Sequence, residues 1–361
     1  MKTVTATIDL AALDHNMQVV SAKANGAKVI AVVKANAYGH GAIECAKVMD
    51  KYVKAYAVAR IEEAIELREA NITKDIIMLG GFFSKDDLPL IEKYDISFAI
   101  HSKWQIEAIE DYKPKNQLKG WLQVNVGMER LGFNYDEIDE VIALIDKSNF
   151  IKKPIGMMSH LSCADSPATK IQNDKQLAKW KLFAKKCKGE LSLTNSAELF
   201  SKDSIISDYI RPGIIQYGLS PFNEIKAQDL GLKPVMTLSS KIIKIRTLNP
   251  GDAVGYGASW VCSRPTKIAI IAIGYADGYP RAMPNGSEVL INNRICHTVG
   301  HVCMDMMFVD IGLDFEDKVG DEVILWGDRI SVDSLAQRVN TIGYELVTGL
   351  TSRVEYRYLN K

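Results

Sequence analysis

The sequence carries no excess of charge of either sign, because 44 Lys and Arg residues balance 44 Asp and Glu residues among its 361 positions. Binding to the phosphate backbone of a nucleic acid depends on a basic surplus, so a nucleic-acid partner is not expected. The first ten residues lack the apolar core of a signal peptide, and no nearby apolar run is long enough to span a bilayer. We therefore expect an unprocessed cytoplasmic protein with no membrane partner.

The sequence also lacks a cysteine framework. Its six cysteines are scattered, which is typical of reduced thiols in a cytoplasmic protein. Cys296, His297, His301 and Cys303 lie close together, but their spacing fits no usual zinc pattern. On an alternating strand Cys296 and His297 would moreover face opposite sides. We predict neither a disulfide nor a metal site.

The first two thirds of the chain contain short apolar runs that alternate with amphipathic stretches. Apolar residues at helical spacing separate the runs, as in residues 61–68 and 138–145. This alternation predicts a parallel sheet, and eight such units within about 200 residues predict a closed (β/α)8 barrel of the TIM type. A doubly wound open sheet is the alternative. The eight runs are residues 28–33, 55–59, 75–79, 96–100, 118–126, 154–159, 191–194 and 208–210.

After about residue 233 the helical periodicity fades and β-branched runs take over. These runs, separated by Asn-, Pro- and Gly-rich turns, predict a predominantly β C-terminal domain. A helix at 332–339 and a final strand at 352–358 are expected to complete it. We divide the chain into a barrel, residues 1–232, and a β-rich domain, residues 233–361. The runs are residues 236–245, 267–273, 288–291 and 322–325.

Catalytic residues of such barrels lie at the carboxyl ends of the strands. The residues there are mostly cations and hydrogen-bonding groups, which predicts an anionic ligand. Lys34 follows five apolar residues, and a desolvated lysine among cations has a lowered pKa that suits Schiff-base formation. A solvated lysine at a loop start is the alternative. The strand-end set is Lys34, Arg60, Gly80, Gly81, His101, Arg130, His160, Asn195, Ser196 and Arg211.

Two segments near the last barrel strands predict a phosphate site. Asn195 and Ser196 open a predicted helix, and residues 211–214, Arg-Pro-Gly-Ile, contain a glycine that lets backbone N–H groups approach an anion. An ordinary Arg-Pro-Gly turn is the alternative interpretation of the second segment.

Residues 31–41, AVVKANAYGHG, resemble the cofactor-lysine motif of the alanine racemases, which carry pyridoxal 5'-phosphate on a barrel. Further motifs follow in the order of that family over essentially the whole chain. The resemblance implies an isomerase that interconverts L- and D-alanine and supplies D-alanine for peptidoglycan. The further motifs are residues 127–132, His160, residues 195–196, 211–214, 255–257, 274–278, 303–305 and 341–346.

The resemblance implies two catalytic bases, Lys34 and Tyr256. Racemisation removes a proton from one face of Cα and returns it to the other, which suits two groups that approach from opposite sides. Lys34 would also hold the cofactor covalently. Tyr256 would come from the partner subunit of a head-to-tail homodimer, so that each site is shared.

The resemblance also assigns the remaining site residues. Arg211 would face the pyridine nitrogen and, since arginine accepts no proton, would keep the cofactor a weaker electron sink and disfavour transamination. His160 would lie against the ring and share hydrogen bonds with Arg211 and Tyr256. The phosphate would be held by Tyr38, Asn195, Ser196, Gly213, Ile214 and Tyr344. The substrate carboxylate would be bound by Arg130 and the backbone of Met304. A narrow entrance would be formed or supported by Asp165, Tyr275, Arg281, Asp305 and Tyr344.

Two positions depart from the family pattern. Gln123 stands where many members have a carbamylated lysine, so we expect it to hold Arg130 by its neutral amide or through a bound small anion. His301 stands near the entrance where an arginine is usual, which leaves the gating role of that position open.

Three other functions are alternatives to alanine racemisation. A racemase of broader specificity, acting on serine or lysine, resembles the chain but commonly carries an export signal. Decarboxylases of the same architecture are usually longer and lack the Gly-Tyr-Gly tyrosine in this setting. Non-catalytic carriers of pyridoxal phosphate end after the barrel, whereas this chain continues for a whole domain.

Overall fold

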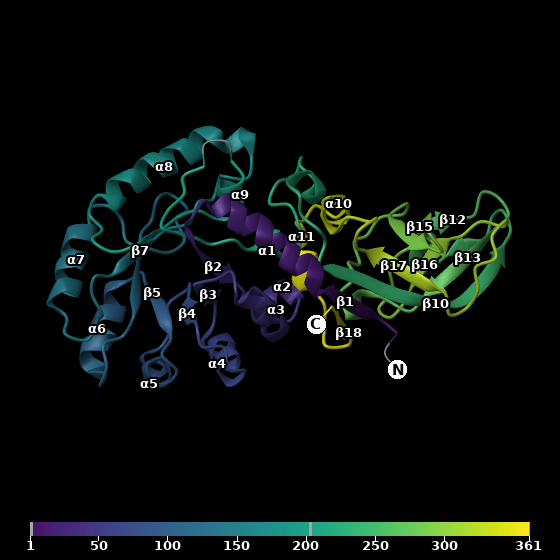
Figure 1. The fold of residues 1–361 in the computed structure, drawn as a ribbon. Coiled ribbons are helices and arrows are strands. Elements are labelled where there is room, and N and C mark those ends of the chain that lie inside the picture. The colour runs from purple at the N-terminus through teal and green to yellow at the C-terminus, as the bar shows by residue number, and fades with distance from the viewer. Residues whose placement is uncertain (1–2, 202–203, 361) are drawn as a thin grey trace.

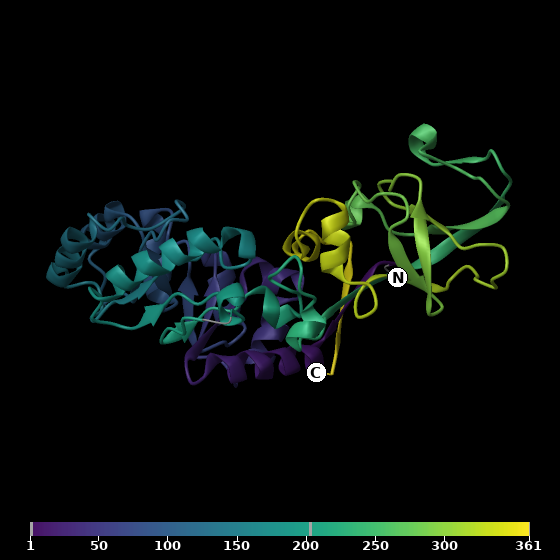
Figure 2. The same cartoon turned by 90° about the horizontal axis from the view of Figure 1, so that it is seen from above.

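The computed structural model describes residues 3–201 and 204–360, and they form two lobes (Figures 1 and 2). One lobe is a ring of parallel strands with helices around it, and the other is a largely antiparallel sheet. The strands nearest to the two chain ends pair with each other where the lobes meet. No helix in the described part of the chain combines the length and the apolar character needed to cross a membrane.

Eight parallel strands close into a barrel, because β9 pairs with β2. The closed ring confirms the predicted (β/α)8 fold and rules out the open doubly wound sheet. The strands are short and mostly buried, since helices cover them outside and side chains fill the interior. Their bounds are β2 (Lys28–Val32), β3 (Ala55–Val58), β4 (Asp75–Met78), β5 (Ser97–Ile100), β6 (Gly120–Gln123), β7 (Gly156–Met158), β8 (Leu191–Ser192) and β9 (Tyr209–Ile210).

Helices alternate with the barrel strands, and both amphipathic segments singled out in the sequence are helical. The first helix begins at Asp9, whose Oδ1 accepts the N–H groups of Ala11 and Ala12 at 2.9 and 3.3 Å. The bounds are α1 (Leu10–Ala24), α2 (Lys34–Gly39), α3 (Ala42–Met49), α4 (Ile61–Glu69), α5 (Leu88–Lys93), α6 (Lys103–Tyr112), α7 (Ile138–Lys147), α8 (Lys170–Ala184) and α9 (Ser196–Leu199).

The second lobe is built on an eight-stranded sheet in the order β13-β16-β15-β14-β17-β10-β1-β18. The long strand β10 bends and pairs also with β13, which closes six of these strands into a ring. All four predicted β runs are strands here. The bounds are β1 (Thr5–Asp9), β10 (Met236–Leu248), β13 (Thr266–Ile271), β14 (Glu288–Ile291), β15 (Arg294–Val299), β16 (Met307–Asp310), β17 (Glu322–Trp326) and β18 (Glu355–Leu359), with β11 (Ala253–Val254) and β12 (Trp260–Val261) as a separate hairpin.

Strand β1 ties the two ends of the chain together, and no pattern in residues 5–9 predicts it. It runs antiparallel to β10 and parallel to β18, with Thr5 opposite both Ser239 and Glu355. The expected division at residues 232 and 233 falls just before β10, and β1 crosses it to join the second sheet.

Two short helices, α10 (Val332–Arg338) and α11 (Gly343–Thr348), lie between the lobes (Figure 2). Helix α11 packs against α2 at the mouth of the barrel. The approach is close, because a Cβ on Gly39 would lie 2.1 Å from the carbonyl oxygen of Val347. The second lobe therefore reaches the carboxyl ends of the barrel strands through α11.

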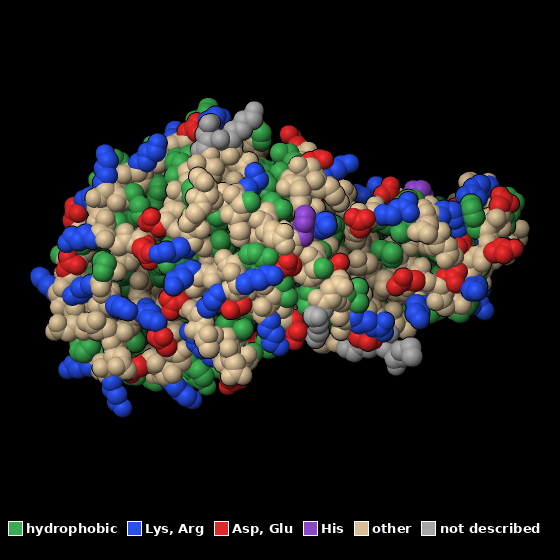
Figure 3. Space-filling view, viewed as in Figure 1, with side chains coloured by type: hydrophobic (Ala, Val, Ile, Leu, Met, Phe, Trp, Pro, Cys, Tyr) green, Lys and Arg blue, Asp and Glu red, His purple; other side chains and the backbone are tan. Residues whose placement is uncertain are grey.

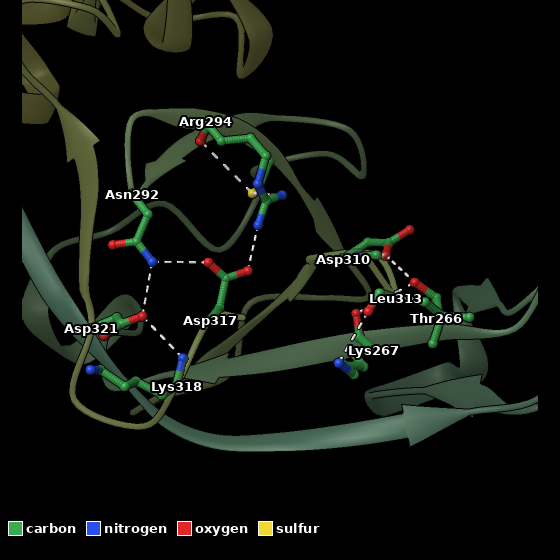
Figure 4. A network of polar contacts seen from close by, with 11 residues as sticks. Thr266, Lys267, Asn292, Arg294, Asp310, Leu313, Asp317, Lys318 and Asp321 are labelled. Carbon is green, nitrogen blue, oxygen red and sulfur yellow. Dashed lines mark hydrogen bonds and ion pairs between the residues drawn. The ribbon is translucent and has the colours of Figure 1, made fainter. Parts of the chain in front are cut away.

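A partly buried ion pair anchors one end of the second sheet (Figure 4). The Arg294 guanidinium, stacked on Phe315, pairs with the nearly buried Asp317. Asn292 Nδ2 donates to Asp317 at 3.0 Å and to Asp321 at 2.9 Å. Since a buried charge is costly unless paired, this network fixes the loop that follows β16 against the β14–β15 turn.

Acidic and basic side chains are intermixed over both lobes on the face shown in Figure 3. No single sign of charge gathers on this face, in keeping with the balanced composition. Exposed ion pairs such as Lys103 with Glu140 contribute little to stability individually.

Candidate active site

A cavity of about 810 Å³ opens at the carboxyl ends of the barrel strands, with α10 and α11 along one side. Its volume suits a ligand the size of a cofactor with a small substrate. It brings together eleven of the site residues expected from the sequence, whereas Ile214, which follows one of them, is fully buried. The eleven are Lys34, Tyr38, Gln123, Arg130, His160, Asp165, Asn195, Ser196, Arg211, Gly213 and Tyr344.

Lys34 lines this cavity because β2 ends two residues before it and directs the chain into the mouth of the barrel. Burial and the Arg130 guanidinium lower the pKa of the Lys34 amine, while the Glu63 carboxylate opposes them. The lowered pKa expected from the sequence is thus found. A lysine in this state can act as a nucleophile or as a proton acceptor.

Arg211 is almost completely buried at the end of β9, where backbone groups hold its guanidinium. Its Nη1 donates to the carbonyl oxygen and the hydroxyl of Ser192 at 2.8 and 2.6 Å, and its Nη2 donates to the carbonyl oxygen of Ser159. Burial lowers the pKa of Arg211 to about 10, which leaves it cationic at neutral pH. The group therefore offers the cavity donors and a positive charge but no acceptor.

His160 follows β7 and lies among the cations of the cavity. Burial, followed by Arg211, Arg130 and Lys34, lowers the pKa of the His160 imidazole to about 3. The ring is consequently neutral at physiological pH. A neutral imidazole in the wall can pack against a planar ligand without adding charge.

Tyr38, Ser196 and Gly213 form a polar cradle in the cavity wall. Ser196 Oγ accepts the Gly213 N–H at 2.9 Å, and Asn195 Oδ1 caps the helix that carries Ser196. A Cβ on Gly213 would lie 2.7 Å from the Tyr38 hydroxyl, so glycine is what allows this approach. The Tyr344 ring of α11 lies 5.8 Å from that of Tyr38. Hydroxyl and backbone N–H donors of this kind suit a phosphate group.

The turn after Lys34 is a feature that sequence reasoning missed. Residues 35–38 all have φ between 51° and 53°, so four consecutive non-glycine residues form a left-handed turn. Its Ala and Tyr residues have no preference for this conformation, so no local signal could have predicted it. The turn carries Tyr38 from the end of β2 to the cradle.

Comparisons with known proteins cover almost the whole chain. Residues 8–221 match the model of the alanine racemase N-terminal domain, and residues 235–358 match that of the C-terminal domain. The chain is 45% identical over 359 residues to the alanine racemase of Aliivibrio salmonicida, with 99% of this chain and 100% of the relative covered. It is 44% identical to the alanine racemase of Vibrio cholerae, with 99% of each covered.

The chain belongs to the alanine racemase family.

Solved structures agree with this assignment. The biosynthetic alanine racemase of Pseudomonas aeruginosa superposes with a TM-score of 0.94 at 37% identity, with 99% of each chain covered. The alanine racemase of Acinetobacter baumannii gives 0.90 at 36% identity, with 99% of this chain and 100% of that chain covered. The family and the racemase class expected from the sequence are confirmed, and so is the fold.

In this member of the alanine racemase family, the expected site residues of the second lobe lie outside the barrel cavity, with the exception of Tyr344. Tyr256 is 72% exposed on a short turn just before β12, and β12 lies in the lobe opposite the barrel in Figure 1. Met304 is 53% exposed, and its carbonyl oxygen accepts the N–H of Ala276. The full set outside the cavity is Tyr256, Tyr275, Arg281, Met304 and Asp305.

The two departures from the family pattern lie in different places. Gln123 ends β6 and lines the cavity with Arg130, and its expected role as a support for Arg130 stays a prediction. His301 is exposed in the second lobe. Cys296 is buried and the adjacent His297 is exposed, which confirms that they face opposite sides of β15.

Proposed function

We propose that this protein interconverts L- and D-alanine with pyridoxal 5'-phosphate held in the barrel cavity. The observation that carries the proposal is the convergence of a lysine of lowered pKa, a buried arginine and a hydroxyl cradle at one barrel mouth. Pyridoxal phosphate, when bound, supplies an electron sink that makes the Cα–H of an amino acid acidic.

The residues present fit that cofactor. The Gly213 backbone, Ser196, Tyr38 and Tyr344 offer hydrogen-bond donors for the phosphate, and the tight space at Gly213 matches a close backbone approach. Asn195 would support Ser196 by capping its helix, and Ile214 would extend the backbone cradle. Lys34 would hold the aldehyde carbon covalently.

Arg211 and His160 would set the electrostatics around the pyridine ring of the bound cofactor. Arg211 would donate a hydrogen bond to the pyridine nitrogen, and three hydrogen bonds to Ser159 and Ser192 keep it from moving. Its positive charge keeps that nitrogen unprotonated, which disfavours transamination. His160, neutral because of its low pKa, would pack beside the ring without competing for protons at neutral pH.

Lys34 would carry the proton on one face of the substrate. The same burial and the same Arg130 charge that lower the pKa of its amine make the neutral form available as a base at Nζ. Arg130 would bind the substrate carboxylate. Its positive charge also keeps the pKa of the Lys34 amine low, so that the amine can release the proton again.

The proton on the other face needs a second base that approaches from the side opposite Lys34. We assign it to Tyr256 of a second copy, as the family resemblance implies, because this side chain is exposed and does not line the cavity of its own chain. The same second copy would bring the backbone of Met304 to the substrate carboxylate, and the residues Tyr275, Arg281 and Asp305 to the entrance beside Asp165 and Tyr344. A narrow entrance of this kind favours a methyl side chain.

We place the reaction in the cytoplasm, where it would supply D-alanine for peptidoglycan. All six cysteines are free thiols, as expected in a reducing compartment. The balanced charge of the chain favours a small-molecule substrate over a nucleic acid, and a second copy of the chain is the partner that the shared site requires.

Incubation of L-alanine in deuterated buffer with the protein and pyridoxal phosphate tests the proposal. Chiral analysis should find D-alanine deuterated at Cα with the unmodified protein and a loss of at least about 100-fold with Tyr256→Phe. Tyr135→Phe, a substitution at another tyrosine that lies outside the cavity lining, is the matched control and should leave the rate unchanged.

Three results would contradict the proposal. Conversion of serine or lysine in place of alanine would favour the broader-specificity racemase. Cofactor absorbance without racemisation of any amino acid would favour a carrier. Full activity of Tyr256→Phe would refute the second base.

A further inference from the structure

The left-handed turn after Lys34 needs external support. Left-handed backbone is unfavourable for residues other than glycine, and here residues 35–38 adopt it in succession. Such a conformation persists only when surrounding groups hold it. At its far end Asn36 Oδ1 accepts the Ala42 N–H at 2.8 Å, and Gly39 packs on α11.

At the end next to Lys34, the support is the carboxylate of Glu63. Its Oε1 accepts the N–H of Ala35 at 2.6 Å, which is the first peptide after Lys34. Its Oε2 accepts the N–H groups of Ala59 and Arg60 at 2.7 and 3.1 Å, where β3 ends. One carboxylate therefore bridges two strand ends of the barrel, and its bond to Ala35 goes beyond the capping of its own helix α4.

Glu63 also counteracts the effect that the neighbouring cations have on the charge of the Lys34 amine. Arg130 disfavours the charged Lys34 amine and Glu63 favours it. The carboxylate thus sits where it affects both the position and the charge of the lysine.

We infer that Glu63 is a positioning residue for Lys34, which holds the strained turn against the end of β3 and balances the positive charge of the cavity. Its significance for catalysis rests on the function proposed above. Displacement of a reacting group by about 1 Å can lower a rate about 100-fold, so this support matters to the reaction.

Two substitutions separate the two effects. Glu63→Gln removes the charge and turns one hydrogen-bond acceptor into a donor that faces an N–H group. Glu63→Asp keeps the charge but is one methylene too short to bridge Ala35 and the end of β3. Glu62→Gln is the matched control, because Glu62 is an exposed neighbour in the first turn of the same helix.

The first measurement needs neither cofactor nor substrate. Competitive labelling of the Lys34 amine in the full chain, with peptide mass spectrometry over a pH series, gives its titration midpoint. The midpoint should move to lower pH in Glu63→Gln and stay near that of the unmodified protein in Glu63→Asp and Glu62→Gln. A midpoint in Glu63→Gln that equals that of Glu62→Gln would overturn the electrostatic part of the inference.

The second measurement compares kcat and KM for alanine. Both Glu63 variants should lose about 10- to 100-fold in kcat with KM changed less than about 3-fold. Unchanged kcat in Glu63→Asp would overturn the positioning role, and this variant suffices if Glu63→Gln does not fold. Failure of the unmodified protein to racemise alanine would refute the proposed function alone, since the labelling result does not depend on it.

Discussion

Replacement of Gly213 by alanine should displace the Tyr38 hydroxyl from the cradle and weaken cofactor binding. The new Cβ would lie 2.7 Å from the Tyr38 oxygen and 3.4 Å from its Cζ, so the oxygen is the atom that has to move. The φ of Gly213 is −118°, outside the left-handed region, and the added methyl group therefore acts chiefly through this contact.

The expected magnitude follows from the one hydrogen bond that is lost. A hydrogen bond to a charged group contributes about 1.5–3 kcal/mol, so Tyr38→Phe and Gly213→Ala should each weaken binding roughly 10- to 150-fold. Because both changes remove the same interaction, the double variant should bind about as weakly as Tyr38→Phe alone. The coupling in this double-mutant cycle then equals the loss caused by one substitution.

Spectroscopic titration of the cofactor-free chain with pyridoxal phosphate measures the four dissociation constants. Gly80→Ala is the matched control, since Gly80 lines the same cavity but its added Cβ would meet the exposed ring of Phe83 at 3.2 Å and the Ala59 carbonyl oxygen only at 3.7 Å. If the double variant loses affinity for pyridoxal phosphate by the product of the two single losses, a shared cradle is refuted. A Gly213→Ala variant that binds the cofactor as tightly as the unmodified protein would refute it too.

Three further substitutions test the electrostatics of the cavity wall. Burial raises the pKa of Asp333 to about 6, so the stabilisation from its protonated form is complete below about pH 4 and is lost as the pH rises through 6. Asp333→Asn keeps an acceptor for the Ser220 N–H, and its free energy of unfolding should exceed that of the unmodified protein by up to about 3 kcal/mol at pH 8 but by only about 1 kcal/mol at pH 4.5. Equal free energies of unfolding at pH 8 would contradict this. The pKa of His160 is lowered to about 3, so protonation of this residue in the unfolded chain destabilises the fold between pH 6 and 4. In urea unfolding, His160→Gln should reduce the change in the free energy of unfolding with pH by about 1.4 kcal/mol per pH unit. An unaltered pH dependence would argue against a buried neutral imidazole. Arg211→Lys keeps the charge, but a lysine amine cannot reach Ser159 and Ser192 together. The substitution should lower the free energy of unfolding of the cofactor-free chain by about 2–4 kcal/mol in urea. An unchanged urea midpoint would mean that the hydrogen bonds to Ser159 and Ser192 do not hold the Arg211 side chain.

The barrel could be predicted because its strands carry their own signal. Continuous apolar runs such as residues 29–32 and 98–100 are buried on both faces, and the residues that follow them necessarily gather at one mouth. The cavity residues from Lys34 to Arg211 were therefore accessible to sequence reasoning, and the family resemblance added Tyr38 and Tyr344.

Other features depend on contacts that no local pattern encodes. Strand β1 joins a sheet whose other members begin more than two hundred residues later, and strands β15 and β16 are short and partly exposed. The left-handed turn after Lys34 arises because Glu63, Asn36 and α11 hold it, against the preference of its own residues. The role of Glu63 followed only from the position of its carboxylate.

The most direct test of the central claim is complementation between two inactive variants. Lys34→Ala and Tyr256→Phe, each purified and inactive alone, are mixed under conditions that allow subunits to exchange, and alanine racemisation is measured. If Lys34 and Tyr256 act together from different copies, activity should recover to about a quarter of that of the unmodified protein, since half of the re-assorted dimers are mixed and each holds one native site. A mixture that stays inactive after demonstrated exchange would contradict the shared site.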